Sequence, residues 1–431
     1  MTFEVIKVLF AMAFGACVGS LSNVLVYRIP LGLDFVSPQS RCTNCDTKLT
    51  WRENIPIFGW LFLRGRCRFC KSPVSAEYPI VEAFMAALWG LTFIVCYTDR
   101  STWLGNLVMP LRPEWAYGGF EQTWPIYVCI VMLWACLTCA TLVDWRTFTI
   151  PPLFTNVPVI LAVIAYPLWA LYISRQPGGS LQMTSPGHSW SIATFGDDSW
   201  PWLGAALGGV LGLIIANILL RYKVLRRSFE DYAAWEKDWL SKLEQEGKDP
   251  NNPENWIAYP HARREMFREL LFVGFPLAFA IAGFAIAHKL AGPWVFNPST
   301  LRMESTLDTV PLVWQVLTGV LLGYLIGGGI VWLFRILGSL GFGKEALGLG
   351  DVHLMAAVGA VLGWIDPVIA FFGGAIVGMI IFLVQLFRGK EGGRVMPFGP
   401  PLCIAVVLLF FAKPAFEALA SWAMKSPIDL P

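Results

Sequence analysis

The sequence predicts an all-α polytopic membrane protein with about 8–10 transmembrane helices. Hydrophobic residues make up 56% of the 431 positions and charged residues only 14%, whereas about a quarter of the residues in a soluble domain are charged. The apolar residues also occur in blocks of about twenty, roughly the length of helix that crosses a bilayer core. We therefore expect the chain to lie in lipid, and its net charge of +2 gives no indication of nucleic-acid binding.

Ten apolar blocks are candidates for the membrane-spanning helices. They are 4–27, 78–97, 124–143, 151–173, 201–220, 270–290, 312–337, 352–364, 366–387 and 398–420. The eighth block is short and the ninth follows it closely, so the count stays between eight and ten. The first block has no basic segment before it, which indicates a retained span and not a cleaved signal.

These blocks and the polar segments between them divide the chain into five regions. They are a first transmembrane helix at 1–27, a loop domain at 28–77, membrane helices at 78–220, a charged helical insertion at 221–269 and further membrane helices at 270–431. If the N-terminus lies outside, 24 of the 32 lysines and arginines fall in loops on the inner side. Cytoplasmic loops are enriched in these residues, so we expect the loop domain and the insertion to be cytoplasmic.

Two long segments have unusual compositions. Segment 174–200 is rich in Gly, Ser and Pro, and we expect it to be irregular and outside. The insertion carries one aromatic and apolar stripe at helical spacing. The stripe consists of Tyr232, Trp235, Trp239 and Leu243. Such a stripe would lie at the headgroup boundary or pack on the rest of the protein, and both interpretations stay open.

Four of the ten cysteines lie in the loop domain as two close pairs. They are Cys42, Cys45, Cys67 and Cys70, two C-x2-C pairs separated by 21 residues. Two such knuckles can present four thiolates to one ion, which is the ligand set of a closed structural zinc site. Disulfides and free thiols are the alternatives, although a cytosolic loop disfavours disulfides. We expect Zn²⁺ to hold together a loop domain that is too small to form its own core.

Two aspartates mark the ends of apolar blocks on the predicted cytoplasmic side. Asp144 ends the third block and Asp351 opens the eighth. An ionisable group there is costly unless it faces protein or water, so each is a functional candidate. If the helices bring them together, the two carboxyl groups would share one proton. One could then activate water while the other hydrogen-bonds a carbonyl oxygen, which is the chemistry of metal-independent peptide hydrolysis.

Other interpretations of these residues remain. Aspartates at helix starts often serve as N-caps, and a proton-coupled transporter would also carry membrane carboxylates, although near the midplane. Gly348 and Gly350 would permit strained backbone angles and the close approach of a substrate strand. Three further acids compete for a functional role. They are Glu82, Glu345 and Asp366.

Seven separated segments carry a family resemblance. They are GSLSNVLVYRIP (19–30), the paired cysteines, WRENIPIFGWLFLRGRC (51–67), YPIVE (78–82), DWRTFTIP (144–151), GLGDVHLMAAVGAVLGW (348–364) and MPFGPPL (396–402). In type and order they resemble the prepilin peptidases, which are bacterial inner-membrane aspartic proteases of the GxGD type. A lone GxGD motif would be weak evidence, but seven segments in order are specific.

The resemblance implies an enzyme that removes the leader peptide of type IV prepilins or type II secretion pseudopilins. Asp144 and Asp351 would be the catalytic pair, and the four cysteines would bind Zn²⁺. The family also implies methylation of the new N-terminus with S-adenosylmethionine. Candidate residues for that step are Gly19, Asn23, Arg28 and Glu53. A peptidase alone, with a structural zinc loop, is the alternative.

The resemblance further implies a location. The protein would cross the bacterial inner membrane many times, with both aspartates and the cysteine loop on the cytoplasmic side. A prepilin or pseudopilin substrate would place its apolar N-terminal helix in the lipid bilayer.

The chain departs from the family pattern in two respects. His353 stands where the family often has lysine. It would alter the charge beside Asp351 because imidazole titrates near neutrality, or it is a partly exposed polar contact. The chain is also longer than a typical member, largely through 174–200 and 221–269, and the resemblance assigns no role to those segments.

Overall fold

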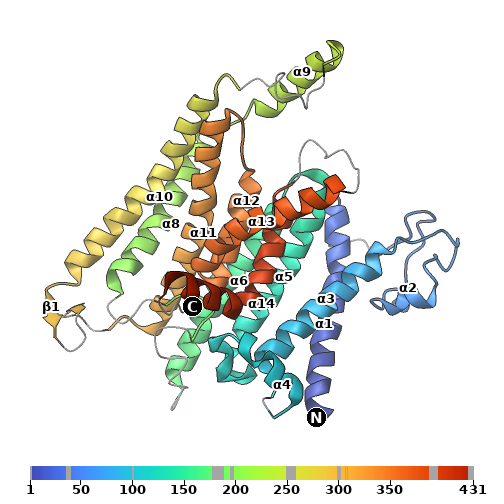
Figure 1. Ribbon diagram of the computed structural model, residues 1–431, viewed down its shortest axis with the longest axis horizontal. Coiled ribbons are helices and arrows are strands. Elements are labelled where there is room, and N and C mark those ends of the chain that lie inside the picture. The colour runs from blue at the N-terminus through green and yellow to red at the C-terminus, as the bar shows by residue number, and fades with distance from the viewer. Residues whose placement is uncertain are drawn as a thin grey trace.

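The computed structural model describes residues 2–34, 40–99, 101–176, 189–194, 199–248, 259–298, 302–305, 307, 309–387 and 397–425. This part of the chain is almost entirely helical (Figure 1). It contains nine helices that are long and apolar enough to cross a membrane. They are α1 (Thr2–Arg28), α3 (Glu77–Tyr97), α5 (Phe120–Thr147), α6 (Pro152–Arg175), α8 (Trp200–Arg221), α10 (Ala262–Leu290), α11 (Leu312–Phe342), α13 (Ile365–Phe387) and α14 (Gly399–Met424).

Each of the ten apolar blocks corresponds to one of these helices or to α12 (Leu349–Leu362). The predicted fold class is therefore confirmed. The boundaries differ most at α10, which begins at Ala262 inside the region assigned to the insertion. Its first turns carry Arg263, Arg264 and Glu265, and an apolar pattern cannot detect a charged helical extension.

Helix α12 is too short to cross a bilayer alone. Its 14 residues extend about 21 Å at 1.5 Å per residue, against a hydrocarbon core of about 30 Å. It packs between α6, α11, α13 and α5. At its C-terminal end, Trp190 and Ile192 are fully buried, and the Ser191 hydroxyl donates to the Val361 carbonyl at 2.8 Å.

The described part of segment 174–200 therefore fills the space beyond the end of α12. Residues 189–194 form no regular structure, as expected, but they belong to the core. Residues 177–188 and 195–198 lie outside the described part of the chain.

Helices α8 and α10 form a closely packed antiparallel pair at one side of the bundle (Figure 1). A Cβ added to Gly208 would lie 2.2 Å from the Phe279 carbonyl oxygen, and one added to Gly283 would lie 2.2 Å from the Gly204 carbonyl oxygen. Small residues of this kind allow two membrane helices to bring their backbones together. The pair joins the bundle through α11.

The remaining elements are short. They are α2 (Phe58–Phe62), α4 (Trp103–Val108), the 3₁₀ turns η1 (Met109–Leu111) and η2 (Glu114–Gly118), α9 (Tyr232–Gln245), β1 (Trp294–Asn297) and β2 (Arg302–Ser305). The two strands pair antiparallel, with Trp294 opposite Ser305. The apolar pattern does not indicate this hairpin between α10 and α11.

The bundle has two ends, which we name after an aspartate at each. At the Asp144 end, α5 finishes beside the start of α3, and Arg146 forms a salt bridge with Glu77. The cysteine loop and α9 lie toward this end, and the β hairpin lies toward the other (Figure 1). Helix α13 begins at this other end with Asp366 in its first turn, so we call it the Asp366 end.

The stripe of the insertion packs on the protein itself. Tyr232 on α9 contacts the rings of Phe229 and Tyr259, with centroids 5.7 and 5.4 Å apart. Tyr232, Phe229 and Tyr259 form a small buried cluster with Met266 of α10 and Ile336 of α11. Of the two interpretations that the sequence left open, the structure supports packing on the chain.

Candidate metal centre and aspartate pair

The two cysteine pairs form turns of the same geometry. The Cys42 amide donates to the Thr47 carbonyl at 3.0 Å, and the Cys67 amide donates to the Ser72 carbonyl at 2.8 Å. The residue after the second cysteine of each pair has a positive φ. These residues are Asp46 at 53° and Lys71 at 59°. Each turn thereby directs two thiols toward the other turn.

The four thiols fit a tetrahedral metal ion. Their Sγ atoms all lie within 4.8 Å of one another, and the Cys42 and Cys70 sulfurs are 3.8 Å apart. A zinc–sulfur distance of about 2.3 Å places the sulfurs of a regular tetrahedron about 3.8 Å apart. All four cysteines are free, so the arrangement fits a metal site and not a pair of disulfides.

Hydrogen bonds around two of the four thiols favour their metal-binding form. The Ser72 hydroxyl, the Ser72 amide and the Asn44 side chain together lower the pKa of Cys70 to about 5. Backbone amides of Cys45 and Asn44 lower the pKa of Cys42. Because the thiolate is the ligand for a metal, these donors favour metal binding at Cys42 and Cys70, whereas burial and the neighbouring Cys42 and Cys70 thiols raise the pKa of Cys67.

The loop domain is attached to the membrane helices through α3. The Ile57 amide donates to the Glu82 carboxylate at 2.6 Å. On the facing helix, a Cβ added to Gly19 would lie 2.8 Å from the Glu82 Cα, so α1 and α3 cross closely here. Asn23 completes the crossing by donating to the Tyr78 carbonyl at 3.1 Å.

The other two methyl-transfer candidates also contact protein groups. Glu53 accepts from the Thr50 amide at 2.6 Å and from Arg68 at 2.9 Å. Arg28 donates to the Asp34 carbonyl at 3.4 Å. All four candidates are thus engaged in helix packing or loop structure, and they do not form a donor set that fits S-adenosylmethionine. We therefore derive no step through that cofactor.

Asp144 lies in the last turn of α5 with 6% of its surface exposed. Its carboxylate faces the backbone of Gly399 at the start of α14. A Cβ on Gly399 would lie 2.5 Å from Asp144 Oδ2, so glycine is required for this approach. A helix N-terminus stabilises a nearby negative charge, and α14 places its N-terminus against this carboxylate.

Asp351 lies in the first turn of α12 and is equally buried. The N-cap residue is Gly348, so the aspartate is not the cap itself, but its carboxylate reaches back to the Gly348 backbone. Neither Gly348 nor Gly350 takes a positive φ, so the prediction of strained angles was wrong. Gly350 instead allows close contact, because a Cβ there would lie 3.0 Å from the Ile150 Cβ.

The structure brings the two aspartates together. Helices α5 and α12 pack on each other, the charge of Asp144 acts on Asp351, and the charges of both act on Cys403 of α14. Among the described residues, neither aspartate forms a salt bridge. Two buried carboxyl groups without a paired cation are costly to stability, which makes the site a functional candidate.

The competing acids have partners that explain them. Glu82 accepts from the cysteine loop, Glu345 pairs with Arg335 at 2.7 Å, and Asp366 pairs with Lys413 at 3.3 Å. His353 lies on α12 with an exposed side chain. This placement fits the interpretation of a partly exposed polar residue.

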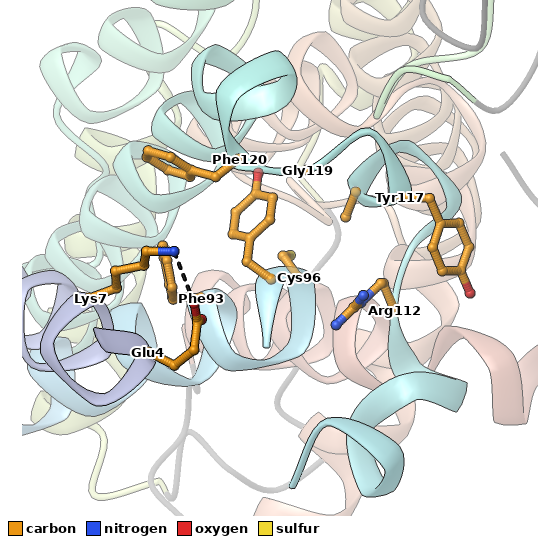
Figure 2. Close-up of a pocket in the computed structure, with 10 residues that line it drawn as sticks. Glu4, Lys7, Phe93, Cys96, Arg112, Tyr117, Gly119 and Phe120 are labelled. Carbon is orange, nitrogen blue, oxygen red and sulfur yellow. Dashed lines mark hydrogen bonds and ion pairs between the residues drawn. The ribbon is translucent and has the colours of Figure 1, made fainter. Parts of the chain in front are cut away.

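Two cavities lie away from both sites. Figure 2 shows the first, of about 150 Å³, where Glu4 and Lys7 of α1 lie across the cavity from Arg112. Arg112 donates to the Val95 carbonyl at 3.2 Å and so satisfies the last turn of α3. The second cavity, of about 210 Å³, is lined by charged residues that include Asp366 and Lys413. Both cavities lie at the Asp366 end, opposite the aspartate pair.

Comparison with known proteins agrees with a membrane-embedded peptidase class. Residues 13–96 match the bacterial peptidase A24 N-terminal domain, which covers the C-terminal part of α1, the cysteine loop and nearly all of α3. The chain is similar to the prepilin leader peptidase/N-methyltransferase of Myxococcus xanthus, with 46% identity over 102 residues. It is also similar to the protein of that name from Klebsiella pneumoniae, with 40% identity over 88 residues.

A longer match is to the type 4 prepilin-like proteins leader peptide-processing enzyme of Escherichia coli, with 29% identity over 174 residues. The three matches cover 24%, 19% and 36% of this chain and 29%, 39% and 55% of the respective relatives. The chain thus matches about a third to about half of the length of these relatives. No solved structure matches the chain. These similarities confirm the resemblance to the prepilin peptidases.

Proposed function

We propose that this protein is an aspartic endopeptidase that removes the leader peptide of prepilins or pseudopilins at the membrane boundary. The observation that carries the proposal is the pair of buried carboxyl groups, Asp144 and Asp351, which lie together without a paired cation among the described residues. The names of the relatives support the substrate class. We further propose that the Asp144 end faces the cytoplasm of a bacterium, as the lysine and arginine asymmetry indicates.

The geometry supports a mechanism in which the two carboxyl groups hold one proton between them. Close carboxylates cannot both ionise easily. The ionised member draws a proton from a water molecule as the water attacks the scissile carbonyl carbon, and the protonated member donates to the carbonyl oxygen. When the tetrahedral intermediate collapses, the proton passes to the leaving amine. The N-termini of α12 and α14 stabilise the remaining negative charge.

The membrane position suits a pilin-like substrate. An apolar N-terminal helix would lie in the bilayer, and its leader would emerge at the Asp144 end. Basic leader residues would be attracted to the two carboxylates and to anionic headgroups. The cysteine loop lies at the same end, where four thiolates would hold Zn²⁺ as a structural ion.

N-methylation of the new N-terminus is a second candidate activity. The match of residues 13–96 and the names of the relatives favour it. The candidate side chains do not favour it, because they already contact other protein groups. Incubating purified protein with a prepilin and a labelled methyl donor separates the alternatives. Cleaved but unlabelled product would leave a peptidase with a structural zinc loop.

The peptidase proposal is tested by replacing each aspartate with asparagine. Asp144→Asn and Asp351→Asn keep the side-chain size but cannot share a proton, so each should lower kcat for leader removal by at least about 10³-fold. Mass spectrometry of a pilin-like substrate in detergent measures both the rate and the cleavage position. Near-full cleavage by either variant would refute the paired mechanism. Wild-type protein that cleaves no pilin-like substrate would refute the substrate class.

A further inference from the structure

Arg335 is a fully buried arginine on α11 at the Asp144 end. It donates to Glu269 at 2.9 Å and to Glu345 at 2.7 Å, and its Nη1 also donates to the Leu347 carbonyl. Among the described residues, Nη2 has no hydrogen-bond partner. A buried donor without a partner is costly, so stability alone does not account for this arginine.

One side of the network leads to the charged insertion. Glu269 on α10 accepts from Arg335, from the Trp332 indole at 3.0 Å and from the Ser228 hydroxyl at 2.7 Å. The guanidinium also lies over the ring of Phe229, 5.4 Å from the centroid. The Arg335 guanidinium therefore attaches the insertion to α11 and also binds Glu345.

The other side of the network holds the turn that leads into α12. Besides the two bonds from Arg335, the Ala346 amide donates to the Ser339 hydroxyl at 3.0 Å. The Tyr259 amide, from the end of the insertion, donates to the Gly343 carbonyl at 2.7 Å. This turn, residues 343–348, is thus fixed against α11 from both directions.

The turn ends at Gly348, the N-cap residue of α12 and the backbone partner of Asp351. The position of the turn therefore sets the position of that carboxylate relative to Asp144. Arg335 is also close enough for its charge to act on Asp351. Reacting groups must be held to well within 1 Å for efficient catalysis, and the network supplies that constraint.

We infer that Arg335 is a positioning residue, which joins the charged insertion to the turn at 343–348. It thereby holds the Asp351 carboxylate at a fixed position relative to Asp144. This inference rests on the proposed peptidase function. It assigns the insertion a role in the site, although no insertion residue needs to contact the substrate.

The first test compares Arg335→Met with Arg335→Lys. Methionine removes every polar contact, and we expect kcat for leader removal to fall about 100-fold while KM stays within about threefold. Lysine can keep one contact to the turn and should restore part of the lost rate. The matched control is Lys413→Met, which breaks the ion pair with Asp366 at the opposite end and should leave the kcat of folded protein unchanged.

A second variant guards against a folding defect. Ser228→Ala removes one donor to Glu269 from the insertion without changing α11 or the turn. We expect kcat to fall about three- to tenfold, with faster hydrogen exchange of residues 343–351 in the same protein. Unchanged exchange and unchanged kcat in the folded Arg335 and Ser228 variants would overturn the inference.

The exchange measurement also separates this inference from the proposed function. If wild-type protein fails to cleave a pilin-like substrate, the peptidase proposal fails. Exchange of residues 343–351 still reports whether Arg335 fixes the turn. If wild-type protein cleaves and the folded Arg335→Met variant cleaves at the same rate, only the positioning role fails.

Discussion

The two ends of the bundle bury aspartates in different ways. At the Asp366 end, Asp366 pairs with Lys413 at 3.3 Å, and both side chains are largely shielded from solvent. At the Asp144 end, Asp144 reaches the backbone of Gly399 at the start of α14, and Asp351 reaches the backbone of Gly348 at the start of α12. Among the described residues neither has a salt-bridge partner. One end neutralises its carboxylate with a cation, and the other leaves two carboxyl groups facing helix N-termini.

This difference separates a carboxylate held in an ion pair from two carboxyl groups that we propose to be reactive. The Lys413 ammonium offsets part of the cost of burying Asp366, so this carboxyl group has a structural partner. A helix N-terminus carries only about half a unit charge, so it moderates the cost of a buried carboxylate without supplying a full counter-ion. We propose that the Asp144 end performs acid–base chemistry, whereas the ion pair at the Asp366 end holds α13 to α14.

The largest expected effect comes from making the same Asp→Asn change at each end. Asp351→Asn should lower kcat by at least about 10³-fold and leave the melting temperature nearly unchanged. Asp366→Asn leaves Lys413 without its carboxylate, which should reduce the free energy of unfolding by about 3 kcal/mol and leave kcat within threefold. Thermal unfolding in detergent and leader cleavage measure the two quantities. If Asp366→Asn abolished cleavage in folded protein, the distinction between the ends would be wrong.

The next effect concerns the approach of α14 to Asp144. A Cβ on Gly399 would lie 2.5 Å from the carboxylate oxygen, so Gly399→Ala must push the carboxyl group or the start of α14 away. We expect kcat to fall about 10- to 100-fold, because the two carboxyl groups lose their alignment. The matched control is Gly329→Ala on α11, where an added Cβ meets nothing within 4 Å. Equal rates for wild type and Gly399→Ala would show that this contact does not shape the site.

Much of this arrangement could be predicted from the sequence because the bilayer restricts what a chain can do. Apolar blocks of about twenty residues must be helices, and few acids interrupt them, so Asp144 and Asp351 stand out. The cysteine spacing likewise predicts a local knuckle, since each pair closes its own turn. These features depend on residues that are close together along the chain.

The features that could not be predicted depend on distant contacts. Arg335 falls near the end of the apolar block 312–337, and the sequence does not show that it is enclosed. It is fully buried because Glu269 of α10 meets it there. Trp190 lies in a segment whose Gly, Ser and Pro content predicts an outer loop, but Tyr166 and the end of α12 enclose it. The role of Gly399 is visible only once α14 is placed against Asp144.

The smallest expected effect concerns the ion pair between Glu53 and Arg68, which lies outside the membrane helices. In the cysteine loop, the Thr50 hydroxyl and Arg68 lower the pKa of Glu53 from 4.5 to about 2. A carboxylate whose folded pKa is lowered stabilises the fold above its unfolded pKa, and that stabilisation is lost as the pH falls from about 4.5 toward 2. The Arg68 side chain is 54% exposed, so solvent screening keeps the contribution small.

Glu53→Gln should therefore reduce the stability of the cysteine loop slightly at neutral pH. The loop stability of the variant should no longer depend on the titration of this side chain in acid. Hydrogen exchange of residues 66–74, compared between wild type and variant from pH 7 to pH 4, measures the difference. The difference in exchange rate between the two proteins should decrease as the pH approaches 4, because the wild-type carboxylate begins to be protonated there and stabilises the loop less. If the difference in exchange rate instead increased in acid, Glu53 would stabilise the loop in its protonated form. The pair would then resemble the aspartates that we propose to share a proton more than the ion pair at the Asp366 end.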